Sequence, residues 1–133
     1  KTTSSIMFLE EIEALKNRTK TFALNTISLF QSLPKTEEAK IIGRQLLRSS
    51  TSVAANYRAT CRARSEAEFF SKISIVVEES DESLFWLEIL QDSKIIYIDS
   101  IQKLKNEAEE LVKIMNTIRH NRKSKGTRVN TPL

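Results

Sequence analysis

Arginine side chains recur along one stretch of this 133-residue chain, where they could bind phosphate groups. From Lys40 to Arg64 there are six basic residues and no acidic residue. If this stretch is helical, four of its arginines share the solvent side and form an arginine stripe: Arg44, Arg48, Arg58 and Arg62. Guanidinium groups suit bidentate phosphate binding, so the stripe is a candidate nucleic-acid contact. The alternatives are pairing with acids of a neighbouring helix or subunit, or simple solvation.

The residues that follow the stripe carry the opposite charge. From Glu66 to Asp92 there are eight acids and one base, Lys72. Two consecutive helical stretches of opposite charge predict an antiparallel hairpin. The other basic region is residues 116–133, which hold five bases and no acid, so residues 1–115 sum to about −1 (+4 minus 5). Further nucleic-acid-binding candidates lie there: Arg119, Arg122, Lys123 and Lys125.

The residue types needed for catalysis or metal binding are scarce. The chain has one histidine, His120, and one cysteine, Cys61, and it lacks a Glu-x-x-His pair and a glycine-rich phosphate loop. A nucleophile pair of Cys61 and His120 would need an electropositive pocket that the sequence does not establish. We therefore expect no catalytic residue, no metal and no cofactor, and we expect that the protein is not an enzyme.

Apolar residues recur at alternating steps of three and four along four segments, which predicts four helices. A stop at Leu33–Pro34 and caps at Thr36 and Ser65 separate the first three helices. Residues 95–98 are apolar and are interpreted as a loop before the fourth helix, although a strand is an alternative. The sequence thus predicts an all-α, antiparallel up-down-up-down four-helix bundle over residues 1–121 and a basic disordered tail over residues 122–133.

One polar residue falls on the apolar face of the second helix. Asn56 is expected to be buried there, and a buried amide must be hydrogen-bonded. A carboxylate of the third helix, Glu79 or Glu82, is the expected partner. Such a pair would fix the register of the two helices, which we favour over a role in ligand binding.

Apolar residues also lie on the outward face of the third helix. Phe85 and Ile89 are one turn apart, and Ile75 is on the same side. This pattern favours self-association, so we expect a homo-oligomer. The chain has no run of about 18 apolar residues, hence no predicted membrane span. Its single cysteine favours a reduced thiol and a cytoplasmic location.

The sequence of residues 48–90 resembles the four-helix bundle protein family, also called the 23S rRNA intervening-sequence protein family. The resemblance lies in an Arg-Ser-rich segment, a Ser-x-x-x-Asn motif, a basic stretch, an acidic Ser-containing helix and a Trp-Leu-Glu end. The matching residues are Arg48, Ser49, Ser52, Asn56, Tyr57, Arg58, Arg62, Arg64, Glu78, Glu79, Asp81, Glu82, Ser83, Trp86, Leu87 and Glu88. The outer helices match in pattern and length only.

The resemblance implies a small bacterial cytosolic bundle, for which the biochemical role of most members is unknown. Some members are encoded within large-subunit rRNA genes. Others resemble the accessory protein of diversity-generating retroelements, a basic pentameric barrel that binds nucleic acid and contacts a reverse transcriptase. The implied function is an oligomeric scaffold that binds RNA or DNA through its arginines, and a pentamer is the first choice of oligomer. The alternative is a protein-interaction module, for example a partner of a reverse transcriptase, without nucleic-acid contact of its own.

Overall fold

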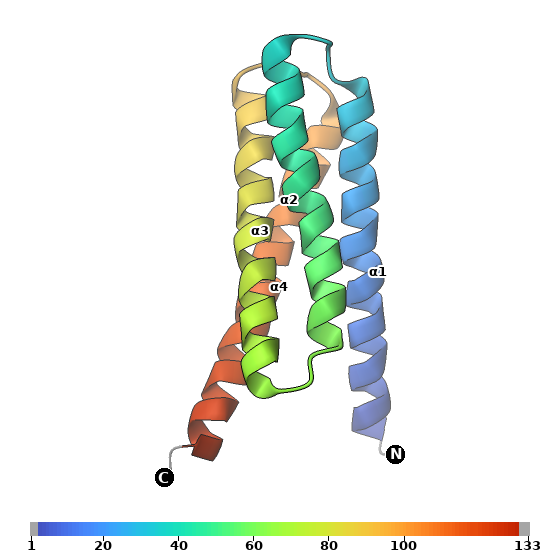
Figure 1. Cartoon of the computed structure of the whole chain (residues 1–133). Coiled ribbons are helices and arrows are strands. Elements are labelled where there is room, and N and C mark those ends of the chain that lie inside the picture. Colours follow the sequence, from blue (N-terminus) through green and yellow to red (C-terminus); the bar gives the residue numbers. More distant parts are fainter. Residues whose placement is uncertain (1–2, 131–133) are drawn as a thin grey trace.

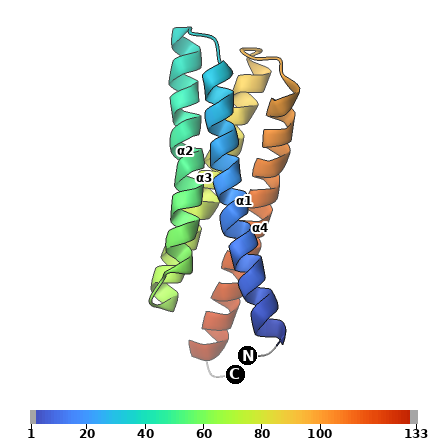
Figure 2. The ribbon, with the colours of Figure 1, turned by 90° about the vertical axis from the view of Figure 1, so that its right-hand side faces the viewer.

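The computed structural model describes the backbone of residues 3–130 and the side chains of residues 8–122. Its four helices are α1 (Thr3–Ser32), α2 (Glu37–Cys61), α3 (Glu66–Asp92) and α4 (Asp99–Asn130). Each helix packs against its neighbours in the chain, and α4 returns beside α1 to close an antiparallel bundle (Figure 1, Figure 2). The predicted all-α, up-down-up-down four-helix bundle is confirmed. Residues 95–98 are a loop, as predicted, and the described backbone contains no strand.

Local hydrogen bonds set where the central helices begin. The hydroxyl of Thr36 accepts the backbone N–H of Ala39 at 3.3 Å at the start of α2. The hydroxyl of Ser65 accepts the N–H of Glu68 at 3.0 Å at the start of α3. Each cap satisfies one of the free N–H groups in a helical first turn. The Ser65 cap lies in the α2–α3 turn, which is at the same end of the bundle as both termini (Figure 1).

The fourth helix is longer than the sequence analysis predicts. Its backbone is helical through Asn130, whereas the prediction ended the helix near Asn121 and placed a disordered tail at residues 122–133. Arginine and lysine have high helix propensity, and cations are favourable near a helix C-terminus, so a helix can continue there without an apolar face. Whether residues beyond 121 are dispensable stays a prediction.

Hydroxyl-bearing residues occupy the centre of the bundle alongside the apolar core. Seven serine and threonine residues are buried among the side chains of residues 8–122, and the hydroxyls of Ser49 in α2 and Ser83 in α3 lie 2.9 Å apart in a hydrogen bond. Thr26 of α1 and Ser50 of α2 are bonded in the same way. No described buried side-chain polar atom lacks a partner. These small residues let α2 and α3 approach closely. Because the two helices are close, side chains on their outer surfaces can contact one another.

None of the described helices combines the length and the apolar character needed to cross a bilayer. The core itself lies along the axis of the bundle and draws on all four helices. Its largest fully buried apolar side chains are Phe22, Leu46, Val53, Ile73, Val76, Leu87, Leu90, Leu111 and Met115.

Candidate nucleic-acid interface

The arginine stripe (Arg44, Arg48, Arg58 and Arg62) is divided by its neighbours on α3. Arg48 is engaged: its Nη1 donates to Glu79 Oε2 at 2.9 Å, and its Nη2 donates to Glu79 and to Glu82. The two carboxylates raise the pKa of the Arg48 guanidinium. For Arg48, the structure therefore matches the alternative of pairing with acids of the third helix.

Glu82 is held by a second donor besides Arg48. The indole Nε1 of Trp86 donates to Glu82 Oε2 at 2.9 Å. This hydrogen bond is the larger cause, and the Arg48 bond the next, of a lowered pKa of the Glu82 carboxyl. Arg48, Glu79, Glu82 and Trp86 thus form a locally compensated cluster, which we call the paired cluster.

The predicted partner of Asn56 is wrong. Its side-chain amide donates to the backbone oxygen and the hydroxyl of Ser52, one turn earlier in α2, at 3.0 and 2.9 Å. Glu79 and Glu82, the expected partners, bind Arg48 instead. Asn56 is also only half-buried rather than buried. Its place in the core is taken by Tyr57, which is 4% exposed.

Four cations surround a shallow hollow at the α2–α3 turn, which we call the cationic hollow. It has a volume of about 320 Å³ and lies over the small side chains Ala55 and Ala59 of α2. Its charged lining is Arg58, Arg62, Arg64, Lys72 and Glu68. Among the described side chains, none of the four cations has an ion-pair or hydrogen-bond partner on its charged group.

The acids nearest this turn are engaged with other groups. Glu68 Oε1 accepts the backbone N–H of Arg64 at 2.7 Å. Glu66 accepts three hydrogen bonds from Arg122 of α4, with Nε to Oε2 at 2.9 Å. Arg122 also lies over the ring of Phe69, with Cζ 3.8 Å from its centroid. The hollow therefore carries a formal charge of +3, from four cations and one carboxylate that caps a helix.

The remaining predicted nucleic-acid-binding residues are placed differently. Arg44 is exposed on α2, nearer the opposite end of the bundle, and has no described partner. Arg119 Nη2 donates to Asn116 Oδ1 at 3.0 Å. Lys123 and Lys125 lie outside the residues whose side chains are described. Of the predicted residues whose side chains are described, the hollow brings together Arg58 and Arg62, and it adds two cations, Arg64 and Lys72, that the prediction did not include.

The predicted interface residues remain on the outer face of α3. Phe85 is 48% exposed, and Ile75 and Ile89 are half-buried. The ring of Phe85 contacts the edge of Trp86, with centroids 4.9 Å apart. Phe85 therefore borders the paired cluster, on the half of the hairpin away from the cationic hollow.

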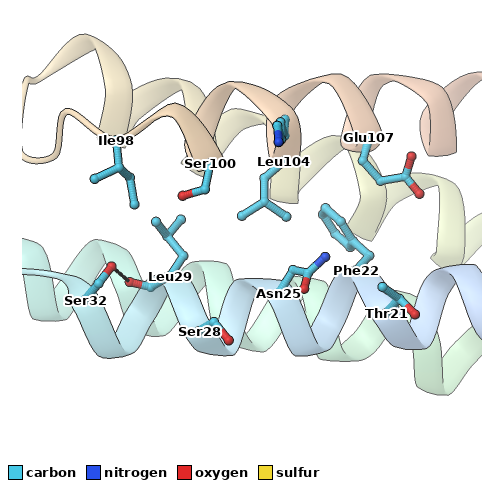
Figure 3. Close-up of a pocket in the computed structure, with 11 residues that line it drawn as sticks. Thr21, Phe22, Asn25, Ser28, Leu29, Ser32, Ile98, Ser100, Leu104 and Glu107 are labelled. Atoms are coloured by element: carbon cyan, nitrogen blue, oxygen red, sulfur yellow. Dashed lines mark hydrogen bonds between the residues drawn. The ribbon is translucent and has the colours of Figure 1, made fainter.

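A larger hollow, of about 540 Å³, lies between α1 and α4 (Figure 3). Phe22 and Leu29 of α1 lie opposite Leu104 of α4 in it. Its acid, Glu107, is bound by Arg18 at 2.6 and 2.8 Å, and this pairing raises the pKa of Arg18. Among the described residues, this hollow has no group of like charges that lack partners. It is therefore a weaker candidate than the cationic hollow for binding a charged ligand.

The cysteine offers no activated nucleophile. Cys61 is half-buried, and burial raises the pKa of its thiol above the ordinary value, despite the hydrogen bond with Tyr57 that lowers it. The thiolate, which is the nucleophilic form, is therefore scarce at neutral pH. In the described part of the chain, no group of three or more metal-binding side chains comes together.

Arg64 and Lys72 are the site residues that the sequence analysis missed. Lys72 had a usable signal, because it is the single base among the eight acids of residues 66–92. It lies two turns after the Ser65 cap, and an antiparallel hairpin folds the second turn of α3 back against the last turns of α2. This antiparallel packing places Lys72 beside Arg58 and Arg62.

Comparison with known proteins supports the resemblance described above. The family model described as 23S rRNA-intervening sequence protein matches residues 11–117, which include parts of all four helices. A solved structure, of a protein with unknown function from the S23 ribosomal protein family of Bacteroides thetaiotaomicron VPI-5482, is 28% identical with a TM-score of 0.75. The alignment covers 82% of this chain and 97% of that one. No curated protein matches the chain. The chain belongs to the 23S rRNA-intervening sequence protein family.

Proposed function

We propose that the protein is a non-enzymatic helical scaffold that binds RNA or DNA without sequence preference through basic side chains. The observation that carries this proposal is the cationic hollow, where four cations lack acidic partners in the described structure. Elsewhere, Arg48 of α2 and Arg122 of α4 are neutralised by glutamates. Cations left without partners on a rigid surface attract phosphate and release counterions when they bind it.

The proposal includes assembly from several copies. Phe85, together with Ile75 and Ile89, presents an apolar strip on α3 that another subunit can cover. Repetition of a weak phosphate-binding surface raises the apparent affinity for a long strand. The pentamer implied by the family resemblance is the proposed number, and light scattering tests it. A monomer at tens of micromolar would contradict assembly, whereas a dimer would contradict only the number.

A salt titration tests nucleic-acid binding. Generic RNA and DNA are titrated with the intact protein and with a hollow variant in which Arg58, Arg62, Arg64 and Lys72 are changed to Gln. The matched control changes four exposed lysines outside the hollow to Gln: Lys20, Lys35, Lys94 and Lys113. The slope of the logarithm of the binding constant against the logarithm of the salt concentration counts the phosphate contacts. If all four hollow cations contact single-stranded phosphates, this slope is less steep by about 3 in the hollow variant, at about 0.7 per contact.

Each outcome of that titration has a definite meaning. Loss of binding in the hollow variant, with little change in the control, supports the scaffold proposal. Equal losses of affinity in both variants would show that binding depends only on the net charge of the protein. A protein ending at residue 121 separates the contribution of the basic C-terminal residues. Absence of binding even at low salt would reject the proposal.

The second candidate function is a protein-interaction module, for example one that contacts an enzyme acting on nucleic acid. Two observations favour it: the paired cluster removes Arg48 from phosphate binding, and Phe85 beside it is half exposed. Under this function, Phe85→Ser changes assembly or partner binding, and the hollow variant retains both. The two variants therefore distinguish the candidates.

A further inference from the structure

The cationic hollow concentrates charge in a small volume. Its volume of about 320 Å³ is at the lower limit of small-molecule pockets, about 300–1,000 Å³, so it accommodates one phosphate-bearing unit rather than a length of strand. This space is lined by Arg58 in the last turn of α2, Arg62 at the C-cap of that helix, Arg64 in the turn and Lys72 on α3. Their combined charge exceeds that of a single internal phosphodiester.

Terminal phosphates fit this arrangement better than internal ones do. A phosphate monoester carries a charge of about −1.5 to −2 at pH 7 and presents three strong acceptor oxygens. An internal phosphodiester carries one negative charge. Arg58 and Arg62 offer planar donor groups that bind two oxygens each, and Lys72 adds a compact positive charge.

The hollow is built so that these cations stay available. Ala55 and Ala59 form its low floor, which leaves room above α2 for a ligand. Glu68, the one carboxylate in its lining, is committed to the backbone N–H of Arg64 at 2.7 Å. The hollow is open to solvent at the bundle surface, so the rest of a strand can leave it without passing through the core.

We infer that the cationic hollow binds the terminal phosphate of a nucleic-acid strand, so that the protein distinguishes strand ends. This inference rests on the proposed nucleic-acid binding and adds the chemical group that is recognised. Arg62 is the residue chosen to test it, because it is exposed, lines the hollow and has no described partner. Arg44 is its matched control, since it is an exposed arginine of α2 outside the hollow.

The experiment compares one short RNA sequence with a hydroxyl at both ends, with a 5′-phosphate and with a 3′-phosphate. Binding is measured by fluorescence anisotropy at low and at moderate salt. A phosphorylated end is expected to bind about tenfold more tightly, which corresponds to one added charge-assisted contact. Arg62→Gln should remove this preference, and Arg44→Gln should keep it.

The outcomes separate this inference from the proposed function. Equal binding of all three RNAs, with a normal salt dependence, overturns end recognition and leaves nucleic-acid binding intact. Failure of every RNA to bind at low salt rejects the proposed function itself. A preference that survives Arg62→Gln and Arg58→Gln together places the recognition elsewhere and also overturns the inference.

Two further measurements test whether the hollow binds a free nucleotide or a second copy of the chain instead of a strand end. Adenosine monophosphate is added as a competitor, and it should displace the phosphorylated RNA only at far higher concentration. Equal potency would assign the hollow to a free nucleotide and contradict strand-end binding. Circular dichroism and mass in solution are recorded for Arg62→Gln. A changed mass would show that the hollow contacts another copy of the chain, which contradicts the inference as well.

Discussion

Arg48 lies on the outer side of α2 and Arg62 is the C-cap of the same helix, and their surroundings differ. Arg48 meets Glu79 and Glu82 on α3 and is neutralised, whereas Arg62 borders a hollow whose other charged lining residues are three cations and one carboxylate. Both residues are exposed arginines that belong to the same side of the hairpin. The difference comes from the residues that the opposite helix presents, so the availability of a cation is a property of the pair of helices.

The small residues between α2 and α3 explain how this difference arises. Ser49 and Ser83 touch in the centre of the bundle, so the backbones approach and outer side chains of the two helices can meet. Near the turn, Ala55 and Ala59 are too short to cover the surface, and Lys72 lies where a glutamate would have neutralised the arginines. One hairpin therefore combines a neutralised half and a positively charged half.

The largest expected effect tests the close approach on which the paired cluster depends. Ser49→Leu should lower the free energy of unfolding by about 1–3 kcal/mol, because added atoms in a packed interior force the helices apart. It also leaves Ser83 without its partner hydroxyl on α2. The control is Thr51→Leu, an exposed position of the same helix, with a change within about 0.5 kcal/mol. Urea unfolding measures both; equal changes would show that this contact does not limit helix spacing.

A smaller effect should separate Arg48 from Arg62 directly. Arg48→Gln should cost about 0.5–1 kcal/mol of stability, a modest figure because the Arg48 side chain is 50% exposed and screened by solvent. Arg62→Gln should change stability by less than about 0.5 kcal/mol, since its charged group has no described partner.

Nucleic-acid binding should show the reverse order for the same two variants. Arg62→Gln should weaken binding, and Arg48→Gln should leave it nearly unchanged. Thermal unfolding and anisotropy on the same samples check both statements. If Arg48→Gln weakens binding as much as Arg62→Gln does, the glutamates do not withdraw Arg48 from phosphate, and the comparison between the two halves fails.

The fold was accessible from sequence because its signals are local. The Ser65 cap, the stop at Pro34 and the apolar spacing of α3 each depend on residues within a few positions. The site was less accessible because it depends on which residues of two helices face one another. The error at Asn56 shows the limit: the three-four spacing of α2 fits two faces that share Leu46, Val53 and Thr60. The structure buries the face that continues through positions 43, 50 and 57, so Tyr57 and not Asn56 lies in the core.

Asn56→Leu tests that reassignment. Because the Asn56 amide bonds within its own helix and is half-buried, the change should alter stability by no more than about 0.5 kcal/mol. Leucine also has the higher helix propensity, which offsets part of the lost hydrogen bond. Urea unfolding and light scattering are the measurements. A loss well above about 1 kcal/mol, or a changed mass in solution, would restore Asn56 to a role in helix register.

The smallest expected effect is the pH dependence of the paired cluster. The folded-state pKa of Glu82 is lowered from its ordinary value of 4.5, chiefly by the Trp86 hydrogen bond and then by Arg48. A lowered pKa means that the ionised carboxylate stabilises the folded state above the unfolded pKa, and that this contribution is lost as the pH falls through the folded pKa. The stability difference between the intact protein and Glu82→Gln should be constant near neutral pH and shrink below about pH 4.5. Because the Glu82 side chain is 34% exposed, its total contribution to stability is expected to be about 0.5 kcal/mol or less.

Trp86→Phe keeps an aromatic ring but removes the indole N–H donor, so it should abolish most of this pH dependence. Persistence of the full dependence in Trp86→Phe would assign the shift to Arg48, and the neutralised half would then rest on the ion pair alone.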